Sequence, residues 1–532
     1  MKMSKWISFF TVTITFFLYS CHTSSDQSIA PNIIIIYTDD QGYGDVSYLN
    51  PEAKFQTPNI DKIAREGVVF TDGHSSDAVC TPSRYSLLTG RYSWRTSLKK
   101  GVLEADGPCL IEKDRMTIAS LLKANGYYTA MVGKWHLQME FQGEPGENRD
   151  WSQPFTEGPV EHGFEYFFGI PASMNYGILT YLENDRVTDP PVLWTKKKPD
   201  PSDRSYGDDI NPKAYRMTPP YDNDPGEGGG WVEVAPSFND ELVLETFAAK
   251  AVEFIDEAAR DERPFFLYLP LTSPHLPHCT HPDFRGRSDC GNYGDFMEET
   301  DFRVGQVLDA LKANGIENNT LVIFSSDNGA ETNYEYQRDT HDHYSSLHFK
   351  GGKRDIYEGG HRVPFLMRWP DMIDAGKTVD VPVCQTDYLA TIADIIGVAL
   401  PDNAAEDSYS LLPYLNDQES IEQERGPVIH HSVTGHFAIR EGKWKLNMLR
   451  GSGGSLKPAF YKPKDGEAPY ELYDLENDPG ETTNLYFEHP EVVGSLIQKI
   501  TSIIENGRST PGVPQDFVRS NWEQITWMSL SE

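Results

Sequence analysis

Cysteine is scarce in this sequence, with six in 532 residues, and no two of them form a Cys-x-x-Cys pair. The sequence therefore argues against a zinc site built from thiolates. Cys279 and Cys290 are close enough in the chain to form a small disulfide in an oxidising compartment. Two free buried thiols fit the sequence equally well, so both interpretations stay open.

Basic residues are also few, with 47 Lys and Arg against 80 Asp and Glu, a formal net charge of −33. Nucleic-acid binding requires a basic surface, so we expect no nucleic-acid partner. The same charge would repel a polyanionic substrate at long range, and any such ligand must be held by local cations. The simpler interpretation of the acidity is that it keeps an exported protein soluble.

Long apolar runs are absent from the sequence after its first twenty residues, so no later segment is expected to span a bilayer. Residues 1–20 join a short basic start to an apolar run, which is typical of a signal peptide. Residues 18–21, Leu-Tyr-Ser-Cys, resemble a bacterial lipoprotein cleavage box that would place a lipid on Cys21. We therefore expect a secreted protein, in the periplasm or anchored to the outer membrane; secretion without a lipid is the alternative.

Four uniformly apolar runs each end in charged or polar residues. The runs are residues 33–37, 128–132, 265–269 and 321–324, and the polar residues that follow them are Asp39, Asp40, Lys134, His136, His275, Asp327 and Asn328. Such runs are typical of parallel strands buried on both faces. Helical patterns lie between them, which predicts an α/β fold with a large, mostly parallel sheet flanked by helices. Sites in such sheets form beyond the carboxyl ends of the strands, so we expect these side chains to meet in one cleft.

The chain divides into two predicted regions after the signal peptide. Residues 31–425 form the predicted catalytic domain. Within it, residues 141–238 are rich in Gly, Pro, Asp and aromatic residues without a long periodic run, and we interpret them as an insertion over the site. Short strand-like runs at residues 437–440, 444–446 and 470–473 and a helical pattern at residues 492–506 predict a smaller α+β subdomain with a short antiparallel sheet over residues 426–532.

The sequence Cys-Thr-Pro-Ser-Arg at residues 80–84 is the sharpest chemical signal. Pro82 suits the first turn of a helix, so Cys80 would lie at a helix N-terminus, where the helix dipole favours negative charge. Arg84 would follow one turn later and could reach an oxyanion. Alone, the pattern also fits a buried structural cysteine before a helix.

Two polar pairs, Asp39-Asp40 and Asp327-Asn328, offer hard oxygen ligands at strand ends. Four such oxygens suit Ca²⁺ or Mg²⁺ rather than zinc. Two adjacent carboxylates also repel each other unless a cation or protons offset their charge. Either pair alone could be a turn or a helix cap, but their joint occurrence after buried strands favours a metal site.

These motifs resemble those of a known family. Residues 80–91 resemble the signature of type I sulfatases, and residues 133–136, 273–275 and 353–364 resemble later motifs of the same family. The resemblance covers roughly residues 31–400 and is greatest to arylsulfatases and N-acetylgalactosamine-6-sulfatases, of the alkaline phosphatase superfamily. It implies an enzyme that hydrolyses sulfate monoesters.

The resemblance also implies the site residues. Cys80 would be converted to formylglycine by a formylglycine-generating enzyme, and one Ca²⁺ would lie beside it. The ligands of that ion would be Asp39, Asp40, Asp327, Asn328 and residue 80. The catalytic residues would be Cys80, Arg84, Lys134, His136, His275 and Lys353. Spacing to the Tyr-Glu-Gly-Gly sequence selects Lys353, with Lys350 as the alternative.

The roles of these residues follow from the family in the same way. Arg84, Lys134 and Lys353 would join the ion in neutralising the sulfuryl oxygens. One hydroxyl of the hydrated formylglycine would attack sulfur, with Asp327 accepting its proton. His275, with Lys353, would protonate the leaving alcohol, and His136 would deprotonate the second hydroxyl to release sulfate.

The substrate expected from the resemblance is a sulfated glycan. The enzyme would act on it as an exo 6-O-sulfatase specific for galactose or N-acetylgalactosamine sugars. Two other functions remain open on the sequence alone. One is a phosphate or phosphonate ester hydrolase of the same superfamily, which relative rates on aryl sulfate and aryl phosphate would separate. The other is a non-catalytic glycan-binding lipoprotein with unmodified Cys80.

Overall fold

The computed structural model describes residues 30–199, 215–217, 219–227, 229–331, 334–415, 425–519 and 522–530. The predicted signal peptide and Cys21 lie outside the described residues. None of the helices in the described part of the chain is long and apolar enough to cross a membrane.

A ten-stranded sheet forms the centre of the molecule, with five neighbouring strands parallel in the order β14-β1-β13-β4-β5. Its strands, in spatial order, are β16 (Lys377–Val379), β2 (Val68–Phe70), β15 (Phe365–Arg368), β14 (Thr320–Ser326), β1 (Asn32–Asp39), β13 (Phe265–Pro274), β4 (Tyr128–Lys134), β5 (Tyr166–Ile170), β7 (Leu182–Glu183) and β8 (Arg186–Val187). The predicted large, mostly parallel sheet is confirmed.

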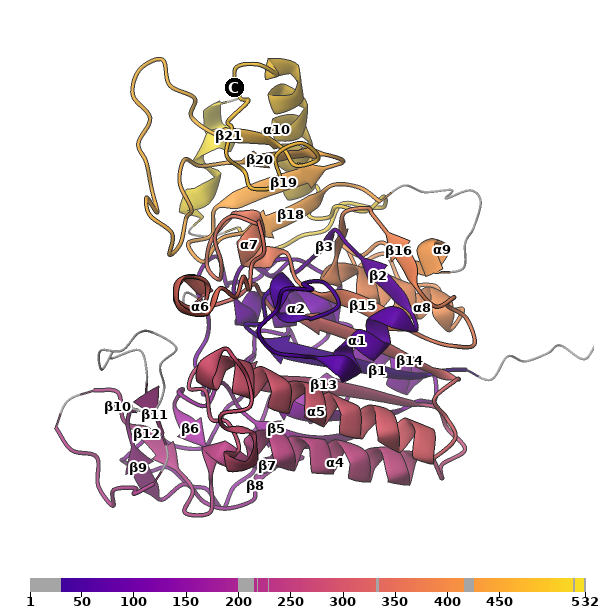
Figure 1. Ribbon diagram of the computed structural model, residues 1–532, viewed down its shortest axis with the longest axis vertical. Coiled ribbons are helices and arrows are strands. Elements are labelled where there is room, and N and C mark those ends of the chain that lie inside the picture. Colours follow the sequence, from indigo (N-terminus) through magenta and orange to yellow (C-terminus); the bar gives the residue numbers. More distant parts are fainter. Residues whose placement is uncertain are drawn as a thin grey trace, which may run out of the picture.

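Helices cover both faces of this sheet (Figure 1). They are α1 (Pro58–Arg65), α2 (Cys80–Thr89), α3 (Ile118–Ala124), α4 (Val243–Ala258), α5 (Gly291–Ala313), α8 (Tyr388–Ile395) and α9 (Leu412–Leu415). Two further helices, α6 (Tyr334–His341) and α7 (Glu358–His361), contribute no described residue to the two cores of the sheet. Successive residues of β1 alternate between two hydrophobic cores: Ile33 and Ile35 pack in the core with α2, α3 and α8, and Ile34 and Ile36 in the core with α1, α4 and α5. This burial on both faces explains why the strand is apolar throughout residues 33–37.

The C-terminal region forms a second, smaller layer (Figure 1). Its antiparallel sheet contains β18 (Val428–His431), β19 (Phe437–Glu441), β20 (Trp444–Asn447) and β21 (Glu471–Asp474), and α10 (Pro490–Glu505) packs on it. The sequence predicted the last three strands and the helix but missed β18. Tyr92 and Trp94, which follow α2, lie in the same hydrophobic core as this region. The C-terminal layer is thus joined directly to the segment that carries Cys80.

Residues 141–238 are only partly the insertion that the sequence predicted. The strands β5, β7 and β8 extend the main sheet, whereas β6 (Ile178–Leu179), β9 (Leu193–Thr195) and β12 (Val232–Val234) form a separate small sheet. β10 (Lys198–Pro199) pairs with β11 (Tyr215–Arg216), and outside this insertion β3 (Gly73–His74) pairs with β17 (Val383–Cys384). β5 was missed because its short apolar run lies among Gly-rich and polar residues. Burial of that run against β4 overrides the local composition.

Cys279 and Cys290 are both free thiols, which settles the alternative left open above. The Cys279 thiol donates to Asp240 Oδ2 at 3.2 Å, and the Cys290 thiol donates to Gln337 Oε1 at 3.1 Å. Each thiol therefore has its own polar partner, and the two residues are held in different hydrogen bonds.

Candidate active site

Cys80 is the first residue of α2, as Pro82 in the first turn predicted. Val79 before it is extended, and Gly90 ends the helix with a left-handed φ of 62°. All ten residues of α2 are buried, and Cys80 is 2% exposed. Burial raises the pKa of the Cys80 thiol, so an unmodified cysteine here would be protonated and a poor nucleophile.

The polar ends of β1 and β14 meet beside this helix. The Asp40 backbone N–H donates to Asp327 Oδ1 at 3.1 Å, and Asn328 Nδ2 donates to Asp40 Oδ1 at 2.8 Å. Asp40 has a left-handed φ of 68°, a strained conformation for an aspartate that is common at functional sites. The convergence expected from parallel strand ends is therefore present.

Three buried cations face three buried carboxylates at this point. Arg84 Nη2 donates to Asp327 Oδ2 at 2.6 Å. Lys134 Nζ, at the end of β4, donates to Asp39 Oδ2 at 2.5 Å, and Lys353 Nζ donates to Asp40 Oδ2 at 2.7 Å. None of these side chains is more than 4% exposed. The six groups form one electrostatically balanced cluster.

The carboxylate cluster fits a divalent cation. Asp39 Oδ1 and Asn328 Oδ1 are buried and accept no hydrogen bond from the residues that the structure describes. Potential ligand atoms of Asp39, Asp40 and His275 lie within 4.8 Å of one another. Burial and the neighbouring Asp39 charge raise the pKa of Asp327 to about 7 despite Arg84. Buried carboxylate and amide oxygens without donors, and a carboxylate that resists ionisation, both indicate room for positive charge.

The two predicted catalytic histidines lie at the same site in different ways. His275 lines the cavity described below, and its Nε2 lies 3.8 Å from Asp40 Oδ2. Burial and the charge of Lys353 lower its pKa to about 4. His136 is fully buried; its Nε2 lies 2.9 Å from Leu103 O, and its Nδ1 has no partner among the described residues.

Alternation along one extended segment would bring both Lys134 and His136 to the cleft, but it does not occur here: β4 ends at Lys134, and His136 has a left-handed φ of 58°. His136 is brought to the site by a turn after the strand rather than by strand alternation. The Leu103 carbonyl accepts from Nε2, which leaves Nδ1 as an acceptor.

A cavity of about 710 Å³ opens over Cys80, His275 and Lys353. Lys350, the alternative to Lys353, does not line it; its Nζ donates to Glu481 O at 3.1 Å and lies 3.7 Å from the Tyr357 ring centroid. The spacing argument therefore selected the lysine that faces the nucleophile position.

Several cavity residues were not found from the sequence. They are Val79, Val102, Asn175, Tyr176, Lys197, Leu276, Glu331, Tyr334, Glu335, Arg354, Val433, Gly454, Ser455, Leu456 and Lys457. They come from the insertion, from loops, from the start of α6 and from the C-terminal region, so no local periodicity marks them. The one sequence feature that could have identified a further cavity residue is the position of Arg354 directly after Lys353.

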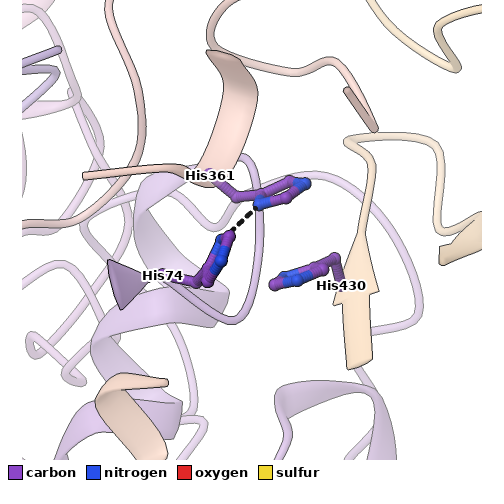
Figure 2. A group of neighbouring side chains, drawn as sticks. All are labelled: His74, His361 and His430. Atoms are coloured by element: carbon purple, nitrogen blue, oxygen red, sulfur yellow. Dashed lines mark hydrogen bonds between the residues drawn. The ribbon is translucent and has the colours of Figure 1, made fainter. Parts of the chain in front are cut away.

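A second cluster of buried histidines lies between the catalytic and C-terminal regions (Figure 2). His74 and His361 face each other with their Nδ1 atoms 3.0 Å apart, and His74 Nε2 lies 2.6 Å from Asp72 Oδ1. Lys445 Nζ donates to His361 Nε2 at 3.1 Å. His361 Nε2 also lies 3.0 Å from Ile356 O. The two contacts compete, because Nε2 must be unprotonated to accept from the Lys445 ammonium and protonated to donate to the carbonyl.

His430 completes the cluster of Figure 2 by stacking on His361 with ring centroids 3.7 Å apart and an interplanar angle of 9°. A histidine binds a metal ion in the plane of its ring. Because these two rings are stacked and nearly parallel, a single metal ion cannot lie in both planes. The ammonium of Lys445 adds further positive charge beside His361. The cluster is therefore a polar junction between two regions, in contrast to the carboxylate site under Cys80.

The fold and the site together define a class of enzyme that holds an oxyanion between buried cations beside a divalent-cation site. The sulfatase family matches residues 31–398, and the family described as the C-terminal part of N-sulphoglucosamine sulphohydrolase matches residues 348–506. The chain belongs to the sulfatase family, within the alkaline phosphatase superfamily, and is a sulfuric ester hydrolase.

Individual relatives agree with this assignment. The chain is 32% identical over 497 residues to an N-acetylgalactosamine-6-O-sulfatase of Bacteroides thetaiotaomicron, covering 90% of this chain and 94% of the relative. It is 34% identical over 482 residues to human arylsulfatase A, covering 88% and 86%. The chain also superposes with a TM-score of 0.75 on a solved 6S-sulfatase structure, from work on the metabolism of multiple glycosaminoglycans by Bacteroides thetaiotaomicron. The two chains are 30% identical, and the match covers 90% of this chain and 99% of that one.

Proposed function

We propose that this sulfatase removes 6-O-sulfate groups from galactose or N-acetylgalactosamine sugars at the ends of glycans, with a formylglycine at position 80 and one bound Ca²⁺. The observation that carries the proposal is the meeting of Cys80, three buried cations and three buried carboxylates under one cavity. The similarity to an N-acetylgalactosamine-6-O-sulfatase along nearly the whole chain supports the choice of sugar.

The charges of the site suit a sulfate ester. Arg84, Lys134 and Lys353 carry three positive charges against the three carboxylates of Asp39, Asp40 and Asp327. Asp39, Asp40, Asp327, Asn328 and residue 80 would hold the Ca²⁺, which when bound supplies excess positive charge for the sulfuryl oxygens. Formylglycine would supply a hydrated aldehyde as nucleophile in place of a thiol whose pKa is raised by burial.

Proton transfer is assigned to Asp327, Lys353 and the two histidines. Asp327 would take the proton of the attacking hydroxyl. Nδ1 of His136 has no other partner among the described residues and would act as the base for release of sulfate. His275 and Lys353 would together protonate the leaving oxygen. Burial and Lys353 lower the pKa of the His275 imidazole to about 4, so near pH 7 the ring is neutral and the transferred proton would come from the Lys353 ammonium.

We further propose that the protein is exported and anchored to a bacterial membrane through a lipid on Cys21, and that a formylglycine-generating enzyme modifies Cys80 during maturation. The support is the sequence pattern of residues 1–21 and the motif at residues 80–91. Fractionation of the native host, with mass spectrometry of the mature N-terminus, tests the export and the lipid together. An N-terminus without lipid, found in the soluble periplasm, would contradict the anchor.

A screen of sulfate release from defined saccharides tests the substrate. We expect turnover of 6-sulfated galactose and N-acetylgalactosamine, with little turnover of 4-sulfated or 2-sulfated sugars. Aryl phosphate serves as the comparison ester. Faster hydrolysis of aryl phosphate than of every sulfate ester would contradict the proposal.

A further inference from the structure

The loop of residues 40–45, which follows β1, begins in a strained conformation, because Asp40 has a left-handed φ of 68°. Two glycines of the loop are tied down through their backbones. Gly42 N donates to Asp45 Oδ2 at 2.7 Å, and Gly44 N donates to Ser345 O at 2.7 Å. A Cβ on Gly42 would lie only 2.3 Å from Ser345 O, so the loop lies directly against this neighbouring segment. A strained residue keeps its conformation only where its surroundings fix it, and these bonds contribute to that constraint on Asp40.

Asp45 holds the far end of this loop through a fully buried carboxylate. In addition to the N–H of Gly42, Tyr293 Oη donates to Asp45 Oδ2 at 2.6 Å, and His343 Nε2 lies 2.7 Å from Asp45 Oδ1. None of the three side chains is more than 1% exposed. Among the described residues, Asp45 forms no ion pair with a lysine or an arginine. The carboxylate is therefore stabilised by these donors, and loss of one leaves a buried acceptor undersatisfied.

The hydrogen bonds of His343 fix its tautomer. Lys54 N donates to His343 Nδ1 at 3.3 Å, so Nδ1 carries no proton and Nε2–H donates to Asp45. The ring also packs against Phe55, with centroids 4.6 Å apart. His343 follows α6, whereas Tyr293 lies in the first turn of α5. Two elements that lie 298 and 248 residues away in the chain thus converge on one carboxylate of the loop.

We propose that His343 and Tyr293 are positioning residues for the Ca²⁺ site. Through their bonds to Asp45 they hold the loop of residues 40–45 in the conformation that presents Asp40 to the ion. Neither residue is a ligand itself. The inference rests on the proposed function, which places Ca²⁺ at this site. A loop that must be ordered when the ion binds takes that cost from the binding energy, so loss of either donor should weaken Ca²⁺ binding.

The Ca²⁺ content of the full-length, matured enzyme, dialysed against buffers of graded free Ca²⁺, measures the affinity independently of activity. Tyr293→Phe keeps the ring and removes one donor to Asp45, so Kd for Ca²⁺ should rise about tenfold, roughly the effect of one hydrogen bond to a charged group. His343→Leu removes the other donor and should raise Kd by a similar factor. His343→Gln keeps an N–H that can reach Asp45, and Kd should stay within about threefold of wild type.

Tyr127→Phe is the matched control. Tyr127 is 2% exposed, and its hydroxyl donates to Pro31 O at 3.0 Å, before the start of β1 and at the opposite end of that strand from Asp39. This variant should lose similar stability in urea but keep the Ca²⁺ affinity of wild type. Wild-type affinity in both Tyr293→Phe and His343→Leu would overturn the proposal, as would an equal loss of affinity in Tyr127→Phe. A wild-type enzyme that binds no Ca²⁺ would instead refute the proposed metal site.

Discussion

Residue 80 derives its chemistry from its position rather than from its own side chain. It lies at the start of a fully buried helix, above carboxylates from two strand ends and beside Lys353 and Arg84. In this setting a thiol is protonated, whereas an aldehyde hydrate would have cations and a base within the same cluster. Turnover therefore requires conversion of Cys80 to the aldehyde.

Cys80→Ser, produced without conversion of the serine, should lose multiple turnover. A sulfated serine would have no second hydroxyl with which to expel sulfate. We expect sulfate release to fall at least about 100-fold, while binding of a sulfated sugar persists. Calorimetry with the substrate and a sulfate-release assay measure the two properties separately. Sustained turnover by this variant would refute the proposed mechanism.

Lys353 and Lys350 offer a matched pair of substitutions. Lys353→Ala removes the cation between Asp40 and the cavity, and kcat should fall by about 100-fold or more, as for other groups that stabilise a developing oxyanion. Lys350→Ala removes a hydrogen bond to Glu481 O and contacts with the Tyr357 and Tyr473 rings, all outside the cavity lining, so kcat should stay within about threefold of wild type. Steady-state kinetics on one aryl sulfate measure kcat for both variants. Equal losses in both variants would show that the effect is structural.

At the scale of elements, the sequence predicted the parallel strands and their polar ends because a strand buried on both faces must be apolar throughout. It predicted α2 from Pro82 and the last three C-terminal strands from their alternation. It missed β5, whose burial comes from pairing with β4, and the cavity loop at residues 454–457. The position of that loop depends on hydrogen bonds to Asp355, about a hundred residues away, which no local pattern encodes.

The junction between α7 and the C-terminal sheet is held by a buried lysine. Lys445 Nζ lies 3.0 Å from Glu358 Oε1 and 2.9 Å from Glu481 Oε1, and all three side chains are fully buried. Lys445→Met would leave the buried Glu481 carboxylate without its cation and Glu358 with Arg362 alone, so the free energy of unfolding should fall by about 3–5 kcal/mol. Urea denaturation measures this loss.

The control for this variant is Lys499→Met, which removes the exposed ion pair with Glu441 and should cost less than about 1 kcal/mol. A loss at Lys445 no larger than that at Lys499 would show that the junction does not depend on the buried ion pair. Retained kcat in the folded fraction would separate this structural role from catalysis.

At the scale of the whole molecule, buried histidines make stability depend on pH. Burial lowers the pKa of His162 from its usual 6.5 to about 4. Between these values the unfolded chain binds a proton that the folded chain does not, so stability falls as the pH falls from 6.5 to 4. His162→Gln should reduce the stability lost across this window by about 3 kcal/mol, since one pKa unit is worth about 1.4 kcal/mol.

Unfolding of wild type and His162→Gln at pH 7 and pH 4.5 measures that difference. The carboxylates with raised pKa values act in the opposite direction, but they are common to both proteins and cancel in the comparison. An identical pH dependence in the two proteins would contradict a neutral buried His162.

Metal removal should affect both stability and activity. A cation that binds the folded protein alone stabilises it by mass action, so added Ca²⁺ should raise Tm and a chelator should lower it. The chelator should also abolish sulfate release, and Asp39→Asn should show low activity with a weakened response of Tm to Ca²⁺. Thermal unfolding with metal analysis checks this expectation. Full activity in protein shown to be free of metal would contradict it.

The central claim is that residue 80 acts as formylglycine in the cluster formed by the strand ends. Mass spectrometry of the peptide spanning residue 80, from enzyme purified out of its native host and active on sulfate esters, tests it most directly. We predict the mass of an aldehyde in place of the thiol, and its capture by a hydrazine reagent. An active enzyme whose residue 80 is entirely cysteine would contradict the account.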